Sequence, residues 1–153
     1  MQQWIIRFKF GKYEHMALLL GRLLALSLAR YQDLPPRDAI IPIPLHRKRL
    51  QDRGFNQALL LAHHTFPEHH PLRRHWLRRI RSTVPQTGLS AAKRITNMEN
   101  AFHADPQVAG KHLLLIDDVI TTGATLNAAA QTLKEAGAAS VNVVVLARKM
   151  FSP

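Results

Sequence analysis

The stretch LLLIDDVITTGATL, residues 113–126, joins an apolar run, two adjacent carboxylates and a group of small residues. The apolar run is typical of a strand that is covered on both faces of a parallel sheet. Asp117 and Asp118 end this run, although the chain has only 10 acidic residues and a formal net charge of +11. Small residues at positions 121–125 then open a segment with helical spacing of its apolar residues. The stretch therefore predicts a strand over 111–116, a connection rich in polar groups, and a helix.

The flanking segments repeat this alternation. Leu126, Ala130 and Leu133 form the apolar face of the predicted helix, which ends at Gly137, and residues 140–147 (SVNVVVLA) predict the next strand. Upstream, residues 38–45 predict a strand. Strand, helix and strand at this spacing imply a right-handed crossover. We therefore expect an α/β fold with a central, mainly parallel sheet flanked by helices.

The remaining segments are less regular. Residues 3–10 indicate a short strand, residues 14–30 a helix that ends before Pro35 and Pro36, and residues 57–64 another helix. Residues 67–85 fit neither period. Ser90 resembles an N-cap, because apolar residues recur behind it at helical spacing: Ala91, Ile95, Met98 and Phe102. No repeat or linker divides the chain, so residues 1–153 are expected to form one domain.

The composition narrows the class of protein. The chain has no cysteine, which excludes a disulfide framework and a thiolate metal site and agrees with a reducing cytoplasm. The most apolar segment, residues 16–29, contains Arg22 and is shorter than the roughly 20 residues of a membrane helix. It is therefore expected to be a core helix, and no membrane insertion is expected.

The positive charge is clustered. Residues 46–54 (HRKRLQDRG) hold four Lys or Arg, and residues 73–82 (RRHWLRRIRS) hold five. Such clusters suit polyanions: nucleic acid, an anionic membrane surface or a ligand rich in phosphate. An ordinary solvated surface is the alternative.

The predicted topology turns residues 113–126 into a candidate site. Ligands of open α/β sheets bind beyond the carboxyl ends of the strands. At 121–125 the chain enters a helix, whose first N–H groups and dipole favour an anion, most often phosphate. Gly123 allows close approach, and the threonine hydroxyls add donors. Phosphate is therefore expected at Thr121, Thr122, Gly123, Ala124 and Thr125.

The two carboxylates cannot hold phosphate directly. They accept hydrogen bonds from sugar hydroxyls, or they hold Mg²⁺ through its waters while the metal bridges to phosphate oxygens. The inferred ligand is a sugar phosphate with a second phosphate group elsewhere. Neither a Gly-x4-Gly-Lys-Ser/Thr loop nor a Gly-x-Gly-x-x-Gly motif occurs in the sequence, so a P-loop and a dinucleotide fingerprint are excluded.

Residues 113–126 resemble the phosphoribosyl-pyrophosphate loop of the type I phosphoribosyltransferases, and the chain as a whole resembles the ComF/GntX group. The motifs IPIPLHRKRLQDRGFNQALLLA (41–62) and RSTVPQTGLSAAKRITNMENAF (81–102) carry this resemblance together with the loop and FKFGKYE (8–14). Many members begin with a cysteine-rich zinc-binding segment, whereas this chain starts near the point where that segment would have ended. We therefore expect a single phosphoribosyltransferase-like domain without the zinc segment.

The resemblance implies phosphoribosyl pyrophosphate and Mg²⁺ as ligands. Asp117 and Asp118 would contact the ribose hydroxyls with the metal close by, and residues 121–125 would cradle the 5′-phosphate. The basic turn after the first core strand would face the pyrophosphate, and residues 86–97 would form a mobile segment that closes over the site. The residues expected there are Arg49, Arg53 and Gly54 in the turn and Arg94 in the mobile segment.

The chemistry implied is transfer of the phosphoribosyl group to an acceptor. Pyrophosphate leaves the anomeric carbon while positive charge builds on the sugar; cationic side chains and Mg²⁺ stabilise the leaving group, and the acidic pair supports the sugar. A non-catalytic protein of DNA uptake or DNA utilisation is the alternative, because members of this group are associated with these processes. Its basic surface would then bind single-stranded DNA. The sequence specifies neither the acceptor nor the oligomeric state.

Overall fold

The computed structural model describes residues 15–31, 35–66, 70–81 and 100–149. Its centre is a parallel sheet of β1 (Ala39–Pro42), β4 (His112–Ile120) and β5 (Ser140–Arg148), in the order β1-β4-β5. Helix α6 (Ala124–Glu135) connects β4 to β5. The expected α/β fold with a mainly parallel sheet flanked by helices is confirmed.

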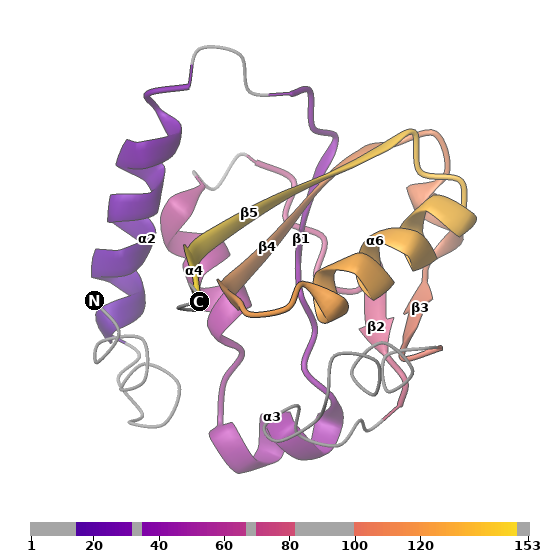
Figure 1. The fold of residues 1–153 in the computed structure, drawn as a ribbon, viewed down its shortest axis with the longest axis horizontal. Coiled ribbons are helices and arrows are strands. Elements are labelled where there is room, and N and C mark those ends of the chain that lie inside the picture. The colour runs from indigo at the N-terminus through magenta and orange to yellow at the C-terminus, as the bar shows by residue number, and fades with distance from the viewer. Residues whose placement is uncertain (1–14, 32–34, 67–69, 82–99, 150–153) are drawn as a thin grey trace, which may run out of the picture.

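Side chains alternate along β4 between two apolar clusters. Leu113 and Leu115 belong to the cluster under α6, whereas Leu114 and Ile116 belong to the cluster under α2 (His15–Leu28) and α4 (Gln57–Thr65). Figure 1 shows α2 and α4 on one side of the strands and α6 on the other. The central strand is buried on both faces, which explains its continuous apolar run.

A small antiparallel sheet of β2 (Leu77–Arg79) and β3 (Phe102–Ala104) lies on the α6 side. The prediction that Phe102 continues a helix from Ser90 is wrong, because Phe102 pairs with Arg79 in this sheet. Asn100 has φ of 52°, a left-handed backbone that ends any helix before residue 102. The rest of that predicted helix, and the strand predicted over 3–10, lie outside the described residues.

Several predicted bounds change. The strand expected over 111–116 extends to Ile120, so the two acids lie inside β4 rather than beyond its end. Leu126 and Leu133 are buried in α6 as expected, but Ala129 is the buried alanine and Ala130 only half-buried. The segment 46–54, expected to be a turn, contains the short helix α3 (Arg47–Arg53), and the short 3-10 helix η1 (Pro106–Val108) precedes β4. None of the described helices is long and apolar enough to cross a bilayer.

Candidate functional site

A pocket opens where β4 passes into α6. The pocket is lined by Asp117, Val119, Ile120, Thr121, Gly123, Ala124, Thr125 and Leu126. Four of the five residues expected to hold phosphate are among them, and Thr122 is not. Thr122 is exposed. The structure thus brings most of the predicted loop to one concave surface at the carboxyl end of the central strand.

Gly123 shapes the entrance to the helix. Its φ of 79° is left-handed, a conformation that costs glycine little, and its carbonyl accepts from the N–H of Asn127 at 2.8 Å. No side chain among the described residues caps α6 through this N-cap position. The dipole of α6 directs partial positive charge toward this entrance, which favours an anion there.

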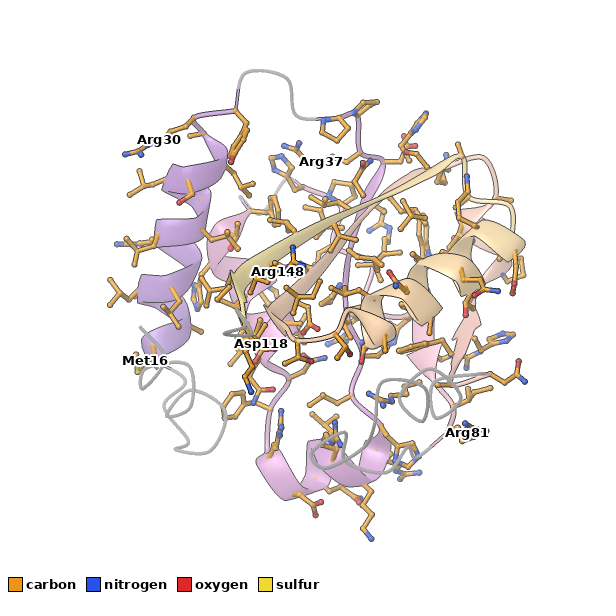
Figure 2. The ribbon with its side chains drawn as sticks, in the orientation of Figure 1. Met16, Arg30, Arg37, Arg81, Asp118 and Arg148 are labelled. Carbon is orange, nitrogen blue, oxygen red and sulfur yellow. The ribbon has the colours of Figure 1, made fainter. Side chains whose placement is uncertain are left out.

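The two acids diverge because strand side chains alternate between faces. Asp117 lines the pocket on the α6 side, whereas Asp118 follows Leu114 and Ile116 toward α4 and is only 6% exposed. Asp118 lies near the C-terminal end of β4 (Figure 2). The adjacent acids therefore point to opposite faces of β4, and Asp117 alone of the two lines this pocket.

Both carboxylates are tied to the backbone that follows them. The N–H of Asp118 donates to Asp117 Oδ1 at 2.9 Å, and the N–H of Val119 donates to Asp118 Oδ1 at 2.8 Å. The strand pairing with β5 skips Asp118 and resumes at Val119. These local bonds orient the two carboxylates before any ligand arrives.

Helix α3 carries the predicted basic residues toward the acids. The helix begins at Arg47, four residues after Ile43. The N–H of Ile43 donates to the carbonyl of Ile116 at 3.0 Å, and Ile116 directly precedes the acidic pair. Arg49 and Arg53 are four residues apart, so they share one face of α3. Gly54 ends the helix with φ of 83°, and its N–H donates to the Leu50 carbonyl.

Electrostatic coupling shows that these groups form one cluster. Burial lowers the pKa of the Arg53 guanidinium, and the charge of Arg49 lowers it further, while Asp118 and Asp117 act in the opposite direction. Such mutual influence requires proximity. The structure therefore places Arg49 and the two acids near Arg53; the role of these arginines toward pyrophosphate stays a prediction.

Arg79 on β2 joins this cluster and was missed by the sequence analysis. Burial and, to a smaller extent, the charge of Arg49 lower the pKa of Arg79 to about 10, while Asp117 acts in the opposite direction. Its guanidinium lies 5.7 Å from the centre of the Phe102 ring. The sequence marked residues 73–82 as basic but offered no signal that singled out this arginine. Arg94, also predicted, lies outside the described residues.

The side chains around the pocket limit how a metal ion could be bound. Within the part of the chain that the structure describes, no group of three or more His, Asp or Glu side chains could hold an ion. Mg²⁺ prefers oxygen ligands and keeps waters, and it is often bound by one or two carboxylates plus substrate phosphates. Asp117 in the pocket could supply one carboxylate to such a shared site. Asp118 points to the opposite face of β4, so the pair does not form a cage of protein ligands.

The sequence of this chain is similar to that of known proteins. Residues 75–152 match the family model described as the phosphoribosyl transferase domain. The DNA utilization protein YhgH of Salmonella typhi is 39% identical over 151 residues, which cover 94% of this chain and 65% of that protein. The competence protein ComFC of Bacillus subtilis is 42% identical over 152 residues, which cover 97% of this chain and 60% of that protein. These relatives confirm the resemblance to the ComF group.

The chain spans about 65% of the length of the curated relatives that it matches first. Among solved structures, the glutamine phosphoribosylpyrophosphate amidotransferase of B. subtilis, complexed with ADP and GMP, superposes with a TM-score of 0.60 at 21% identity. The match covers 97% of this chain and 32% of that protein. This likeness shows that the fold is shared.

Proposed function

Since the chain belongs to the family of phosphoribosyl transferase domains, we propose that it binds phosphoribosyl pyrophosphate with Mg²⁺ and transfers the phosphoribosyl group to an acceptor. The observation that carries this proposal is the arrangement around β4. An uncapped helix N-terminus and Asp117 line one pocket, and a cluster of coupled arginines lies against the same acid pair.

The pocket suits the 5′-phosphate and the ribose. The backbone of the first turn of α6, with Thr121, Gly123 and Thr125, would donate to the phosphate oxygens. Asp117, which shares this pocket, would accept hydrogen bonds from the ribose hydroxyls. Asp118 would act from the opposite face of β4, beside Arg53. The phosphate and the sugar would thus occupy adjacent parts of one surface.

The arginine cluster suits the diphosphate. Arg49, Arg53 and Arg79 carry like charges at close range and are partly withdrawn from water, so an anion would relieve their mutual repulsion. Gly54 and Arg94 are assigned to the same group by resemblance alone. Guanidinium groups bind phosphate oxygens in a bidentate manner, which favours arginine here.

Mg²⁺, when bound, would supply charge stabilisation to the leaving pyrophosphate. Asp117, which lines the pocket, would hold the ion together with oxygens of the ligand. Asp118, on the opposite face of β4, would act on the ion only through bound waters. The chain's own contribution is positioning and electrostatics: the acids support positive charge on the sugar, and the arginines support negative charge on the leaving group.

Calorimetric titration of phosphoribosyl pyrophosphate, with and without Mg²⁺, tests the proposal. The intact protein should show saturable one-site binding that depends on Mg²⁺ and is lost in an Asp117→Asn/Asp118→Asn variant. A Glu135→Gln variant removes an exposed carboxylate from the last turn of α6 and should bind normally. An acceptor screen for pyrophosphate release follows. Absence of binding to the intact protein would reject the transferase.

A second candidate function follows from the relatives, whose names refer to DNA utilization and competence. Exposed arginines gather before, within and just after β2, which favours a polyanion: Arg73, Arg74, Arg78 and Arg81. If single-stranded DNA binds this surface, its affinity should fall steeply as salt rises, with a log–log slope of about −0.7 per phosphate contact. Binding in the metal-dependent pocket should instead respond mainly to Mg²⁺ and to the acid variants.

A further inference from the structure

Gln57 is a buried polar side chain at the margin of the arginine cluster. It is the first residue of α4 and only 2% exposed. Its Oε1 accepts a hydrogen bond from Arg53 Nη1 at 3.3 Å. Its Nε2 is also buried and has no hydrogen-bond partner among the described residues. The carboxamide oxygen therefore forms a hydrogen bond, whereas the carboxamide nitrogen can still donate one.

The orientation of the amide follows from chemistry. A guanidinium only donates hydrogen bonds, so the oxygen of Gln57 must face Arg53 and the nitrogen must face away from that bond. The two halves of the carboxamide are bonded to one carbon. The spare donor therefore lies beside the guanidinium and close to any group that Arg53 binds.

The backbone beneath Gln57 is held firmly. Asn56 donates from Nδ2 to the Ile43 carbonyl at 3.0 Å and accepts from the N–H of Leu59 at 3.3 Å. These bonds join the start of α4 to the end of β1. Gln57 and Arg53 are thereby placed at the same edge of the sheet as the acid pair, whose charges act on Arg53.

Packing alone does not explain a glutamine here. The buried positions of α4 closest to Gln57 are apolar, Ala58, Leu61 and Ala62, and the one other buried polar residue of this helix, Thr65, lies at its far end. A buried donor without a partner is unfavourable, and an apolar side chain of similar size would avoid this cost. A polar group kept under such conditions is better explained by a ligand that completes its hydrogen bonding.

We propose that Gln57 is a positioning residue for a diphosphate group: it orients Arg53 and offers Nε2 to an oxygen of the anion that Arg53 binds. This inference rests on the proposed function and adds to it the residue that sets the direction of the arginine. The 5′-phosphate pocket lies at the other end of the ligand and does not depend on Gln57.

Two ligands and two variants test the assignment. Gln57→Met keeps the size of the side chain and removes both polar atoms. It should weaken binding of Mg²⁺–pyrophosphate and of phosphoribosyl pyrophosphate about tenfold or more, the range for hydrogen bonds to charged groups. Ribose 5-phosphate lacks the diphosphate, so its affinity should change less than twofold. Gln51→Met, at an exposed position of α3, is the control and should bind all three ligands normally.

Stability separates positioning from a structural role. Gln57→Met removes an unpartnered buried donor, which is stabilising, and the 3.3 Å hydrogen bond from Arg53, which is destabilising. The melting temperature should therefore change little, whereas loss of a structural glutamine would lower it clearly. Gln57→Glu provides a second variant in case the first does not fold. It keeps an acceptor for Arg53 but replaces the donor by a negative oxygen, so pyrophosphate binding should again be lost selectively.

The outcomes distinguish this inference from the function on which it rests. If the intact protein binds no phosphoribosyl pyrophosphate, the proposed function fails and takes the role of Gln57 with it. If the intact protein binds but both variants bind pyrophosphate normally, or lose ribose 5-phosphate to the same extent, the function stands and the role of Gln57 is rejected. Selective loss of diphosphate binding in a stable variant supports it.

Discussion

Replacement of Arg79 by methionine should make the protein more stable and less able to bind its ligand. Burial and the charge of Arg49 lower the pKa of Arg79 from its ordinary value to about 10, a shift of about 2.5 pKa units. One pKa unit corresponds to about 1.4 kcal/mol, so the charged form costs the fold at most about 3.4 kcal/mol at pH 7. Because the side chain keeps partial exposure to solvent, we discount this penalty to about 2 kcal/mol.

Methionine has a similar length and can remain against Phe102 without a charge. The variant loses the contact of the guanidinium with that ring, 5.7 Å from its centre and worth about 0.5–1 kcal/mol. The expected net effect of Arg79→Met is a gain of about 1 kcal/mol in the free energy of unfolding, measured by urea denaturation at pH 7. Arg78→Met, at the exposed neighbouring position of β2, should change it by less than about 0.5 kcal/mol.

Ligand affinity should move in the opposite direction. If Arg79 stabilises the diphosphate, Arg79→Met should weaken binding of phosphoribosyl pyrophosphate by about tenfold or more, as for a lost charge-assisted hydrogen bond. Arg78→Met should leave the affinity nearly unchanged. A variant that is less stable by 1 kcal/mol, or one that binds the ligand normally, would refute the reasoning.

Lysine at the same position turns the argument into a pH dependence. The environment that lowers the pKa of Arg79 to about 10 should lower that of a lysine from about 10.4 to about 8. A base whose pKa is lower in the folded state destabilises the fold below that value, and the penalty disappears as pH rises toward the unfolded value. The free energy of unfolding of Arg79→Lys, relative to Arg79→Met, should therefore rise between about pH 8 and pH 10.4. A constant difference over this range would contradict a strained charge at position 79.

Three further substitutions test the scaffold of the site by thermal or urea unfolding. Gly123→Ala should cost about 1 kcal/mol, because the added Cβ would meet only ordinary contacts but the φ of 79° disfavours alanine; an unchanged midpoint would mean that the loop adapts. Asn56→Ala should cost about 2 kcal/mol, since it removes the N-cap of α4 and a donor to the Ile43 carbonyl, and a loss below 0.5 kcal/mol would show that neither bond matters. Leu133→Ala, at a fully buried position of α6, should cost about 2–5 kcal/mol, and a smaller loss would indicate that the core closes over the cavity.

The central strand and its helix were predictable because burial on both faces leaves a signal in the sequence. The run over 113–116 has no polar residue to alternate, and the structure distributes its side chains between two clusters, on opposite faces of β4. Gly123 and Gly137 were recognisable because glycine is the residue that most readily adopts a left-handed backbone at the ends of a helix. Both adopt a left-handed φ, 79° and 92°, at the two ends of α6.

Phe102 shows how a periodic pattern can mislead. Its spacing from Met98 fits a helix. The spacing of apolar residues gives no sign, however, of a single residue that changes the direction of the backbone. Asn100 takes φ of 52°, and the chain then enters the three-residue strand β3. A strand of this length is too short to show its own alternation, so the sequence contained no competing signal.

The acid pair was predicted as one feature and is two. Asp117 and Asp118 are adjacent in sequence, and the apolar run before them predicted that both lie beyond the end of a strand. Because β4 continues to Ile120, alternation directs Asp117 to the α6 pocket and Asp118 toward α4. A small error in the predicted end of a strand therefore changes which side chains are expected on the same face.

Arg79 could not have been selected from the sequence, because all five arginines of residues 73–82 look alike there. What distinguishes it is long-range: β2 turns Leu77 inward and Arg78 outward, and pairing with β3 sets Arg79 opposite Phe102. The neighbours that lower or raise its pKa, Arg49 and Asp117, come from two other elements. A charge cluster in sequence shows that anions are attracted, but only the tertiary pairing shows which cation is withdrawn from water. If a diphosphate binds as proposed, its negative charge would offset the cost of burying Arg79 beside Arg49.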